Sequence, residues 1–228
     1  MSHSVIINGE SLPILIRKHA KSRRMVIRYN PAGHSVSLTL PRYVSIRQGL
    51  RFVEEKRVWI EQRILEKKAP VPFADGQTIP LLGMLYTLQH VGGRGVVRIE
   101  GDTIIVPGDS AFMARRVREF LKRVARDTIA EIAAKKAKQL GKTVSKITLR
   151  DTSSRWGSCS HDGNLSFSWR LVFAPYDILE YVTCHEVAHL KHHDHSPAFW
   201  IAVGLLYPDY EKAKQWLKIN GSELYAYG

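Results

Sequence analysis

Residues 183–200 read TCHEVAHLKHHDHSPAFW, and they hold half of the chain's ten histidines within eleven positions. If this stretch is helical, the first two of them, His185 and His189, lie on one face of the helix, one turn apart. Their ring nitrogens can then share one ion, in the way that Zn²⁺ prefers. Glu186 is rotated by about 100° from His185, so it can flank the ion within reach of a metal-bound water. The letters HEVAH thus form the H-E-x-x-H pattern of zinc peptidases.

A catalytic zinc site needs a third protein ligand and one open position. His192 lies two turns of helix from His185, a rise of about 10.5 Å, so it would converge poorly on the same ion. His195 comes directly before Ser196 and Pro197, which are typical of the N-cap and first residue of a new helix. It therefore lies in a turn where the chain can fold back toward the ion. We predict His195 as the third ligand and keep His192 as the reserve.

The segment upstream of the motif predicts a helix start and two strands. Asp177 and Glu180 have the spacing of a capping box, so the helix is expected to begin at Ile178. Before it, KITLRD and NLSFSW are typical of strands joined through SSRWGSCSHDG. The RWGSC letters fit either a tight turn with a buried Trp or an edge strand that lines the cleft and pairs with an extended peptide. Cys159 within them is a conceivable fourth ligand of a closed zinc site.

The rest of the chain alternates strands and helices, which predicts an α+β fold. We expect a β-rich N-terminal lobe with one helix, residues 1–108, and a catalytic lobe, residues 109–228. Ser45 is the predicted N-cap of the helix in the first lobe. The expected elements are strands within 4–40, a helix at about 45–67, strands within 77–106, and a helix from Ser110 to Leu140 that stops at Gly141.

Composition indicates an ordinary soluble chain of 228 residues. No stretch approaches the 18 apolar residues of a membrane span, and the N-terminus does not have the pattern of a signal peptide. Two cysteines make no disulfide framework. We therefore expect a cytoplasmic protein that does not act on membranes, while its oligomeric state is left open.

The net charge of +13 is concentrated in the first two thirds of the chain. Residues 151–228 hold six Lys and Arg against nine Asp and Glu, so residues 1–150 carry +16. One interpretation is attraction to nucleic acid, and the other is a solvated basic face. Five of the cations lie within RKHAKSRR, residues 17–24, which is either a phosphate-binding patch or a solvated turn between strands. This run lacks the interleaved aromatic residues that base stacking requires.

Taken together, HEVAHLKHHDHSPAFW and the upstream RWGSCSHDGNLSFSWRLVFAP resemble the YgjP-like metallopeptidases, relatives of the SprT-like zinc peptidases. The resemblance extends from about residue 14 to residue 220. It implies a zincin-like catalytic half, a Zn²⁺ cofactor and hydrolysis of a protein or peptide substrate. By position it places the zinc ligands at His185, His189 and His195, and the catalytic base at Glu186.

Two further parts of the expected function stay open at the sequence level. Peptide hydrolysis usually needs a second electrophile for the developing oxyanion, and Arg155, His161 and Tyr207 are candidates. The alternatives to a plain peptidase are an SprT-like protease recruited to nucleic acid through its basic N-terminal part, and a non-catalytic module stabilised by zinc. The intact Glu186 argues against the last of these, because a structural site has no use for a base.

Overall fold

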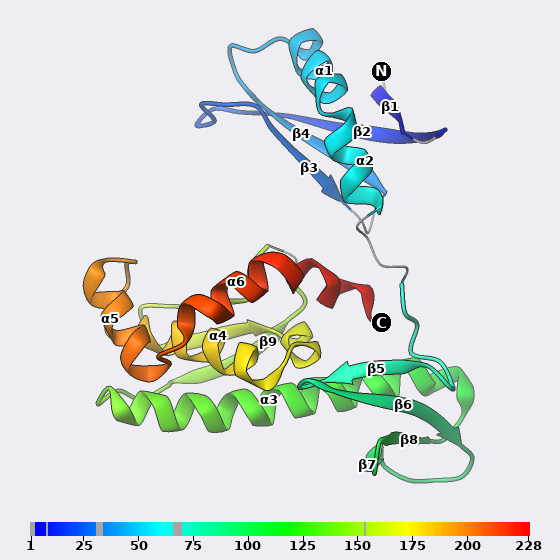
Figure 1. Ribbon diagram of the computed structural model, residues 1–228, viewed down its shortest axis with the longest axis vertical. Coiled ribbons are helices and arrows are strands. Elements are labelled where there is room, and N and C mark those ends of the chain that lie inside the picture. Colours follow the sequence, from blue (N-terminus) through cyan, green and yellow to red (C-terminus); the bar gives the residue numbers. More distant parts are fainter. Residues whose placement is uncertain (1–2, 8, 31–33, 66–69, 153) are drawn as a thin grey trace. The chain divides into compact units, whose positions relative to one another are not determined.

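The computed structural model describes residues 3–7, 9–30, 34–65, 70–152 and 154–228 (Figure 1). Its chain forms two compact units, Met1–Lys68 and Ala69–Gly228, named here unit 1 and unit 2. Each unit has a hydrophobic core of its own. Among the described residues, none of the helices combines the length and apolar character that a membrane span requires.

Unit 1 is a four-stranded sheet with two helices on one face. The sheet has the order β1-β2-β4-β3, in which β2 and β4 run parallel and the outer pairs run antiparallel. Alternate residues of β2 are buried, so one face of the sheet meets the core and the other meets solvent. The elements are β1 (His3–Ile7), β2 (Glu10–His19), β3 (Val26–Asn30), β4 (Ser35–Pro41), α1 (Ile46–Glu55) and α2 (Arg57–Leu65).

The single helix expected at 45–67 is two helices up to residue 65, and residues 66 and 67 lie outside the described part of the chain. Ser45 caps α1 as predicted: its side chain accepts a hydrogen bond from the Gln48 N–H, and the Ser45 N–H donates to the Gln48 side-chain oxygen. The chain leaves α1 at Lys56, whose φ of −98° and ψ of 11° are not helical, and α2 begins at the next residue. The apolar periodicity continues across this break, which is why the sequence alone did not show it.

Unit 2 begins with a second sheet, and this sheet packs on the long helix α3. Ile79, Leu88 and Ile104 of the sheet are fully buried in the same core as Val117 and Leu121 of α3. The observed division between residues 68 and 69 therefore differs from the lobe boundary expected after residue 108. The elements are β5 (Thr78–Leu81), β6 (Met84–Val91), β7 (Arg98–Glu100), β8 (Thr103–Pro107) and α3 (Met113–Gln139), with sheet order β5-β6-β8-β7.

The remainder of unit 2 surrounds the helix that carries the HEVAH motif, α4 (Tyr176–Ala188). This helix contacts α3, α5, α6 and the edge strand β10. The predicted α+β class, with the motif helix packed on a small sheet, is thus confirmed. The other elements are β9 (Lys146–Arg150), β10 (Gly157–Cys159), β11 (Asn164–Ser168), α5 (Pro197–Leu206), α6 (Tyr210–Asn220) and the short 3₁₀ segments Ser110–Phe112, Trp169–Phe173 and Gly221–Ala226, with sheet order β10-β11-β9.

The predicted start of α4 is wrong. The helix begins at Tyr176, two residues before Ile178, and its N-cap is Pro175, whose carbonyl accepts the Ile178 and Leu179 N–H groups. Proline restricts the backbone dihedral φ at the N-cap, and its side chain has no oxygen that could cap the first N–H groups of the helix. Glu180 instead reaches α3, where its Oε1 lies 2.8 Å from the Nζ of Lys136.

Candidate active site

Three histidines from two neighbouring segments converge in unit 2. His185 lies in the last turn of α4, and His189 is the C-cap residue of the same helix. His195 lies in the turn before α5, where Ser196 is the N-cap and Pro197 the first helical residue, as expected. One ring nitrogen from each histidine lies within 4.8 Å of the others.

The ring geometry fits a tetrahedral zinc ion. His195 Nε2 and His185 Nε2 are 3.3 Å apart. Two nitrogens bound to one tetrahedral Zn²⁺ at about 2.0–2.1 Å would be about 3.3–3.4 Å apart. The Nδ1 of His189 lies 2.9 Å from the His192 carbonyl oxygen and donates to it when protonated. This hydrogen bond selects the tautomer in which the His189 Nε2 lone pair is free for a metal.

The environment keeps two of these imidazoles neutral, which is the form that binds metal. Burial, together with the neighbouring His189 and His195, lowers the pKa of His185 to about 3. Burial also lowers the pKa of His189, against the opposing hydrogen bond to the His192 carbonyl. Within the described residues the Nδ1 of His185 is buried without a hydrogen-bond partner.

Glu186 is a buried carboxyl group next to the histidines, with only 5% of its surface exposed. Burial raises its pKa to about 8, while the positive charge of Arg155 pulls in the opposite direction. A divalent cation held beside this group would favour the carboxylate. The side chain lies against the backbone of β10: a Cβ added at Gly157 would come within 2.5 Å of Glu186 Cγ and Oε1. The glycine therefore makes room for the carboxyl group.

Aromatic rings from α5 form the wall behind the histidines. Phe199 is fully buried and stacks on His189, with ring centroids 4.4 Å apart and planes 26° apart. It also meets His185 and His195 edge-on, each at 4.9 Å. Trp200 lies 5.8 Å from His185. Neither Phe199 nor Gly157 was predicted as part of the site, although FW in the stretch 183–200 and the glycine in RWGSC were the available signals.

The structure separates the other candidate residues of the sequence analysis. The His192 ring is not in the converging group, and its backbone carbonyl serves His189 instead. His161 meets His193 at a ring distance of 4.2 Å, also outside that group. The Tyr207 ring contacts the Tyr181 ring, and Tyr181 in turn contacts the His185 ring.

Arg155, just before β10, and Cys159, the last residue of β10, differ in what they can contribute. The positive charge of Arg155 acts on Glu186, so of the three electrophile candidates Arg155 is the one whose charge affects the buried carboxyl group. Cys159 does not belong to the converging group of described residues. Burial and the charge of Glu186 raise its pKa to about 11, so in the absence of a metal ion it is a neutral thiol at pH 7.

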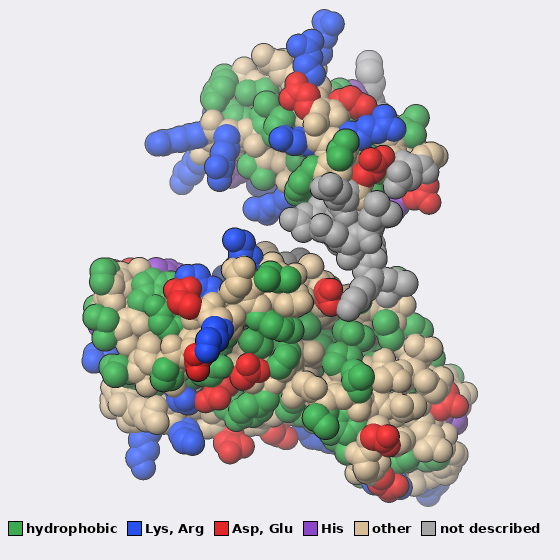
Figure 2. Space-filling view, in the orientation of Figure 1, with side chains coloured by type: hydrophobic (Ala, Val, Ile, Leu, Met, Phe, Trp, Pro, Cys, Tyr) green, Lys and Arg blue, Asp and Glu red, His purple; other side chains and the backbone are tan. Residues whose placement is uncertain are grey.

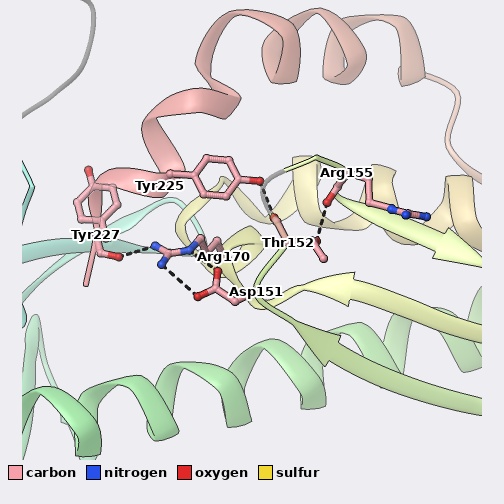
Figure 3. Close-up of polar contacts among 6 residues, drawn as sticks. All are labelled: Asp151, Thr152, Arg155, Arg170, Tyr225 and Tyr227. Carbon is pink, nitrogen blue, oxygen red and sulfur yellow. Dashed lines mark hydrogen bonds and ion pairs between the residues drawn. The ribbon is translucent and has the colours of Figure 1, made fainter. Parts of the chain in front are cut away.

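The loop that carries Arg155 is held by hydrogen bonds from the end of the chain (Figure 3). Tyr225 Oη donates to the Thr152 carbonyl at 2.9 Å, and Thr152 Oγ1 donates to the Arg155 carbonyl at 3.0 Å. Arg170 donates to both Asp151 oxygens, at 2.7 and 3.3 Å, and to the Tyr227 carbonyl at 2.7 Å. These bonds fix the start of the segment that leads into β10.

A family model and two solved structures are similar to parts of this chain. The family model described as "YgjP-like, metallopeptidase domain" matches residues 23–220 and confirms the resemblance. Two similar solved structures are metallopeptidase zymogens, abylysin of Pyrococcus abyssi and jannalysin of Methanocaldococcus jannaschii. Abylysin is 22% identical over 41% of this chain and 92% of its own, with a TM-score of 0.36. Jannalysin is 20% identical over 42% and 94%, with a TM-score of 0.35. No curated protein matches the sequence.

Proposed function

Because the chain belongs to the YgjP-like metallopeptidase family, we propose that it hydrolyses peptide bonds with zinc held by three histidines and with Glu186 as the base. Family membership makes the chain a metallopeptidase. The identity of the ion, its ligands and the base are our proposal. The observation that supports it is the convergence of three imidazoles beside a buried carboxyl group. The ligands are His185, His189 and His195.

Each residue of the site then has a chemical task. Zinc, when bound, supplies a Lewis acid and lowers the pKa of a coordinated water to about 7. Glu186 accepts a proton from the attacking water at a carboxylate oxygen and passes it to the leaving amine. Its position against Gly157 restricts the carboxyl group to one place beside the histidines. The guanidinium of Arg155 is the group that we assign to the developing negative charge on the substrate oxygen.

The strand β10 is suited to hold the substrate. It is an edge strand of its sheet, and it runs from Gly157, beside Glu186, to Cys159. An extended peptide can pair with such an edge through backbone hydrogen bonds. This supports the interpretation of RWGSC as a strand that lines the cleft, with a protein or peptide as the substrate.

The two alternatives differ from this proposal in separate ways. A non-catalytic zinc module needs four protein ligands, and the converging group of described residues has three. Recruitment to nucleic acid, as in an SprT-like protease, would add a binding activity to the same chemistry and concerns the basic N-terminal part. A cytoplasmic location remains part of the proposal.

The test of the base is Glu186→Gln, which keeps the size and burial of the side chain but cannot accept the proton. We expect one zinc per chain by elemental analysis, as in the wild type, and loss of turnover by about 10²-fold or more. A proteome-derived peptide library read by mass spectrometry serves as the substrate, since it assumes no cleavage preference. Equal cleavage by the variant and the wild type would remove Glu186 from the mechanism.

The third ligand is tested by comparing His195→Ala with His192→Ala. The first should weaken zinc retention sharply, because it leaves two protein ligands. The second should leave retention nearly unchanged, since His192 contributes its backbone carbonyl. Zinc content after dialysis against a graded chelator measures both, and the reverse order of losses would make His192 the ligand.

A further inference from the structure

One stretch of unit 1 is strongly and uniformly basic. Residues 11–53 contain nine Lys and Arg and no Asp or Glu. All nine cationic side chains are exposed. No ion pair among the described residues of unit 1 involves any of them, since the pairs there join Glu10 to His34 and Glu54 to Arg57. The charge is therefore unneutralised and available to a partner.

The fold gathers part of this charge at one end of the sheet. His19, the last residue of β2, pairs with Pro41, the last residue of β4, so the turn after β2 and the segment after β4 lie together. Lys18 Nζ donates to the Arg42 carbonyl at 3.4 Å. In Figure 2 the blue side chains crowd the end of unit 1 at which Figure 1 shows the β2–β3 turn, and the red ones lie away from it. We name this surface the cationic end; its cations are Lys18, Lys21, Arg23, Arg24 and Arg42.

An exposed aromatic ring lies among these cations. Tyr43 has 78% of its surface exposed, and its hydroxyl donates to the Arg23 carbonyl at 2.9 Å. The run RKHAKSRR has no aromatic residue of its own, which counted against base stacking at the sequence level. The fold supplies the missing ring from 19 residues beyond the run. A ring held by its hydroxyl edge leaves its faces free for a planar partner.

We propose that the cationic end binds single-stranded nucleic acid, with its Lys and Arg side chains on the phosphates and Tyr43 stacked on a base. The cations alone would fit any polyanion. The ring favours an unpaired strand, because only an unpaired base offers a free face for stacking. An anionic membrane would call for an amphipathic helix at this surface, whereas the cationic end is made of a turn and strand ends.

The binding test uses the full chain and 20-nucleotide oligothymidylate and oligouridylate labelled with fluorescein. Anisotropy is measured from 50 to 200 mM salt, without any peptidase substrate, so the result does not depend on the proposed hydrolysis. Five phosphate contacts predict a salt slope of about −3.5 and a loss of affinity of about 100-fold over this range. The two probes show whether DNA or RNA is preferred, and either preference fits the proposal. No binding at 50 mM salt, or stronger binding to a duplex of equal length, would overturn it.

Variants locate the surface. The triple variant Arg23→Ala, Arg24→Ala and Arg42→Ala should bind at least tenfold more weakly, with a slope shallower by about 2. The control removes the same charge from the groove of unit 2 beside the end of α3, through Arg126→Ala, Lys138→Ala and Lys142→Ala, and should change affinity less than threefold. A larger loss in the control than in the triple variant would overturn the assignment.

The stacking role has its own pair of variants. Tyr43→Phe removes the hydrogen bond to Arg23 and keeps the ring, so affinity should change less than twofold. Tyr43→Ala removes the ring and should weaken binding by about fivefold or more. Equal affinities for both variants would overturn the stacking. Vesicles of phosphatidylserine and phosphatidylcholine complete the set, and binding to vesicles but not to either oligonucleotide would overturn the proposal as a whole.

Discussion

Glu186 lies so close to the backbone of Gly157 that the missing Cβ of the glycine is a requirement of the site. Gly157→Ala would place a carbon within 2.5 Å of the Glu186 side chain, and Glu186, buried in the last turn of α4, has little room to retreat. We expect the variant to bind zinc through the three histidines and to lose most of its turnover. Zinc content and cleavage of the peptide library are the two measurements.

Gly204→Ala in α5 is the matched control for this prediction. A Cβ there would meet only the Tyr210 ring, at an ordinary 3.7 Å. The change should leave turnover intact and stabilise unit 2 by about 0.5–1 kcal/mol, because alanine is the better helix residue. If Gly157→Ala were as active as Gly204→Ala, the contact with Glu186 would have no importance for catalysis.

At the scale of residues, the sequence predicts what depends on spacing and misses what depends on contacts between segments. The i, i+4 spacing of His185 and His189 and the turn before Ser196 predict a convergence that the structure contains. The contact of Gly157 with Glu186 joins a strand to a helix about 30 residues later. No periodicity encodes such a contact, so the glycine could be noticed but not explained.

Among the structural elements, the C-terminal segment holds the loop that leads to β10. Asp151 and Arg170 form the charged part of this connection, and Arg170 also holds the Tyr227 carbonyl (Figure 3). Burial acts to raise the pKa of Asp151, but the hydrogen bond and charge of Arg170 outweigh it and hold the pKa below its ordinary value. The ionised carboxylate therefore stabilises the folded state.

The pH dependence of this stabilisation follows from its sign. A carboxyl group with a lowered folded-state pKa stabilises the protein above its unfolded pKa, about 3.9, and loses this effect as the pH falls through its folded pKa. Asp151→Asn should lower the free energy of unfolding by about 1 kcal/mol at pH 7, since the pair is partly exposed. The difference from the wild type should shrink as the pH falls below about 4.

Urea unfolding, followed by tryptophan fluorescence, measures this difference at each pH. Glu100→Gln is the matched control, because Glu100 pairs with Arg98 on the surface of β7 and both side chains are about half exposed. It should change the free energy of unfolding by less than about 0.5 kcal/mol. Equal effects of the two variants at pH 7 would show that the Asp151 pair is an ordinary surface pair.

Element boundaries show where local sequence signals compete. Asp177 and Glu180 have the letters of a capping box, but Pro175 starts α4 earlier and Lys136 on α3 takes up Glu180. Ser45 and Gln48 have the same kind of pattern, and there the capping box forms. The two cases differ because Glu180 has a tertiary partner, Lys136, which lies on a helix about 40 residues earlier in the sequence.

At the scale of the whole molecule, the two hydrophobic cores share no residue. The core of unit 1 is built from residues between Val5 and Ile64, and that of unit 2 from residues between Val71 and Tyr227. Strands and helices alternate through both units, so their order along the chain does not show which sheet packs with which helix. The packing of the β5–β8 sheet with α3 in one core decides it, because Ile79, Leu88 and Ile104 are buried together with Val117 and Leu121.

Two fragments test where the catalytic unit begins. We propose that residues 69–228 fold alone, because they contain one complete core and the bonds that tie Val71 to the end of the chain, from Val71 N to Ala226 O at 2.8 Å and from Gly228 N to Val71 O at 3.0 Å. This fragment should melt cooperatively by circular dichroism and hold one zinc per chain.

Residues 109–228 correspond to the expected lobe but lack the β5–β8 sheet, so Val117 and Leu121 would face water. Each exposed side chain would cost about 1.5–3 kcal/mol, which is a large part of the stability of a domain. We therefore expect the shorter fragment to melt without cooperativity or to aggregate. Cooperative melting and full zinc content in residues 109–228 would restore the boundary at 108, and failure of residues 69–228 to fold would mean that unit 2 depends on unit 1.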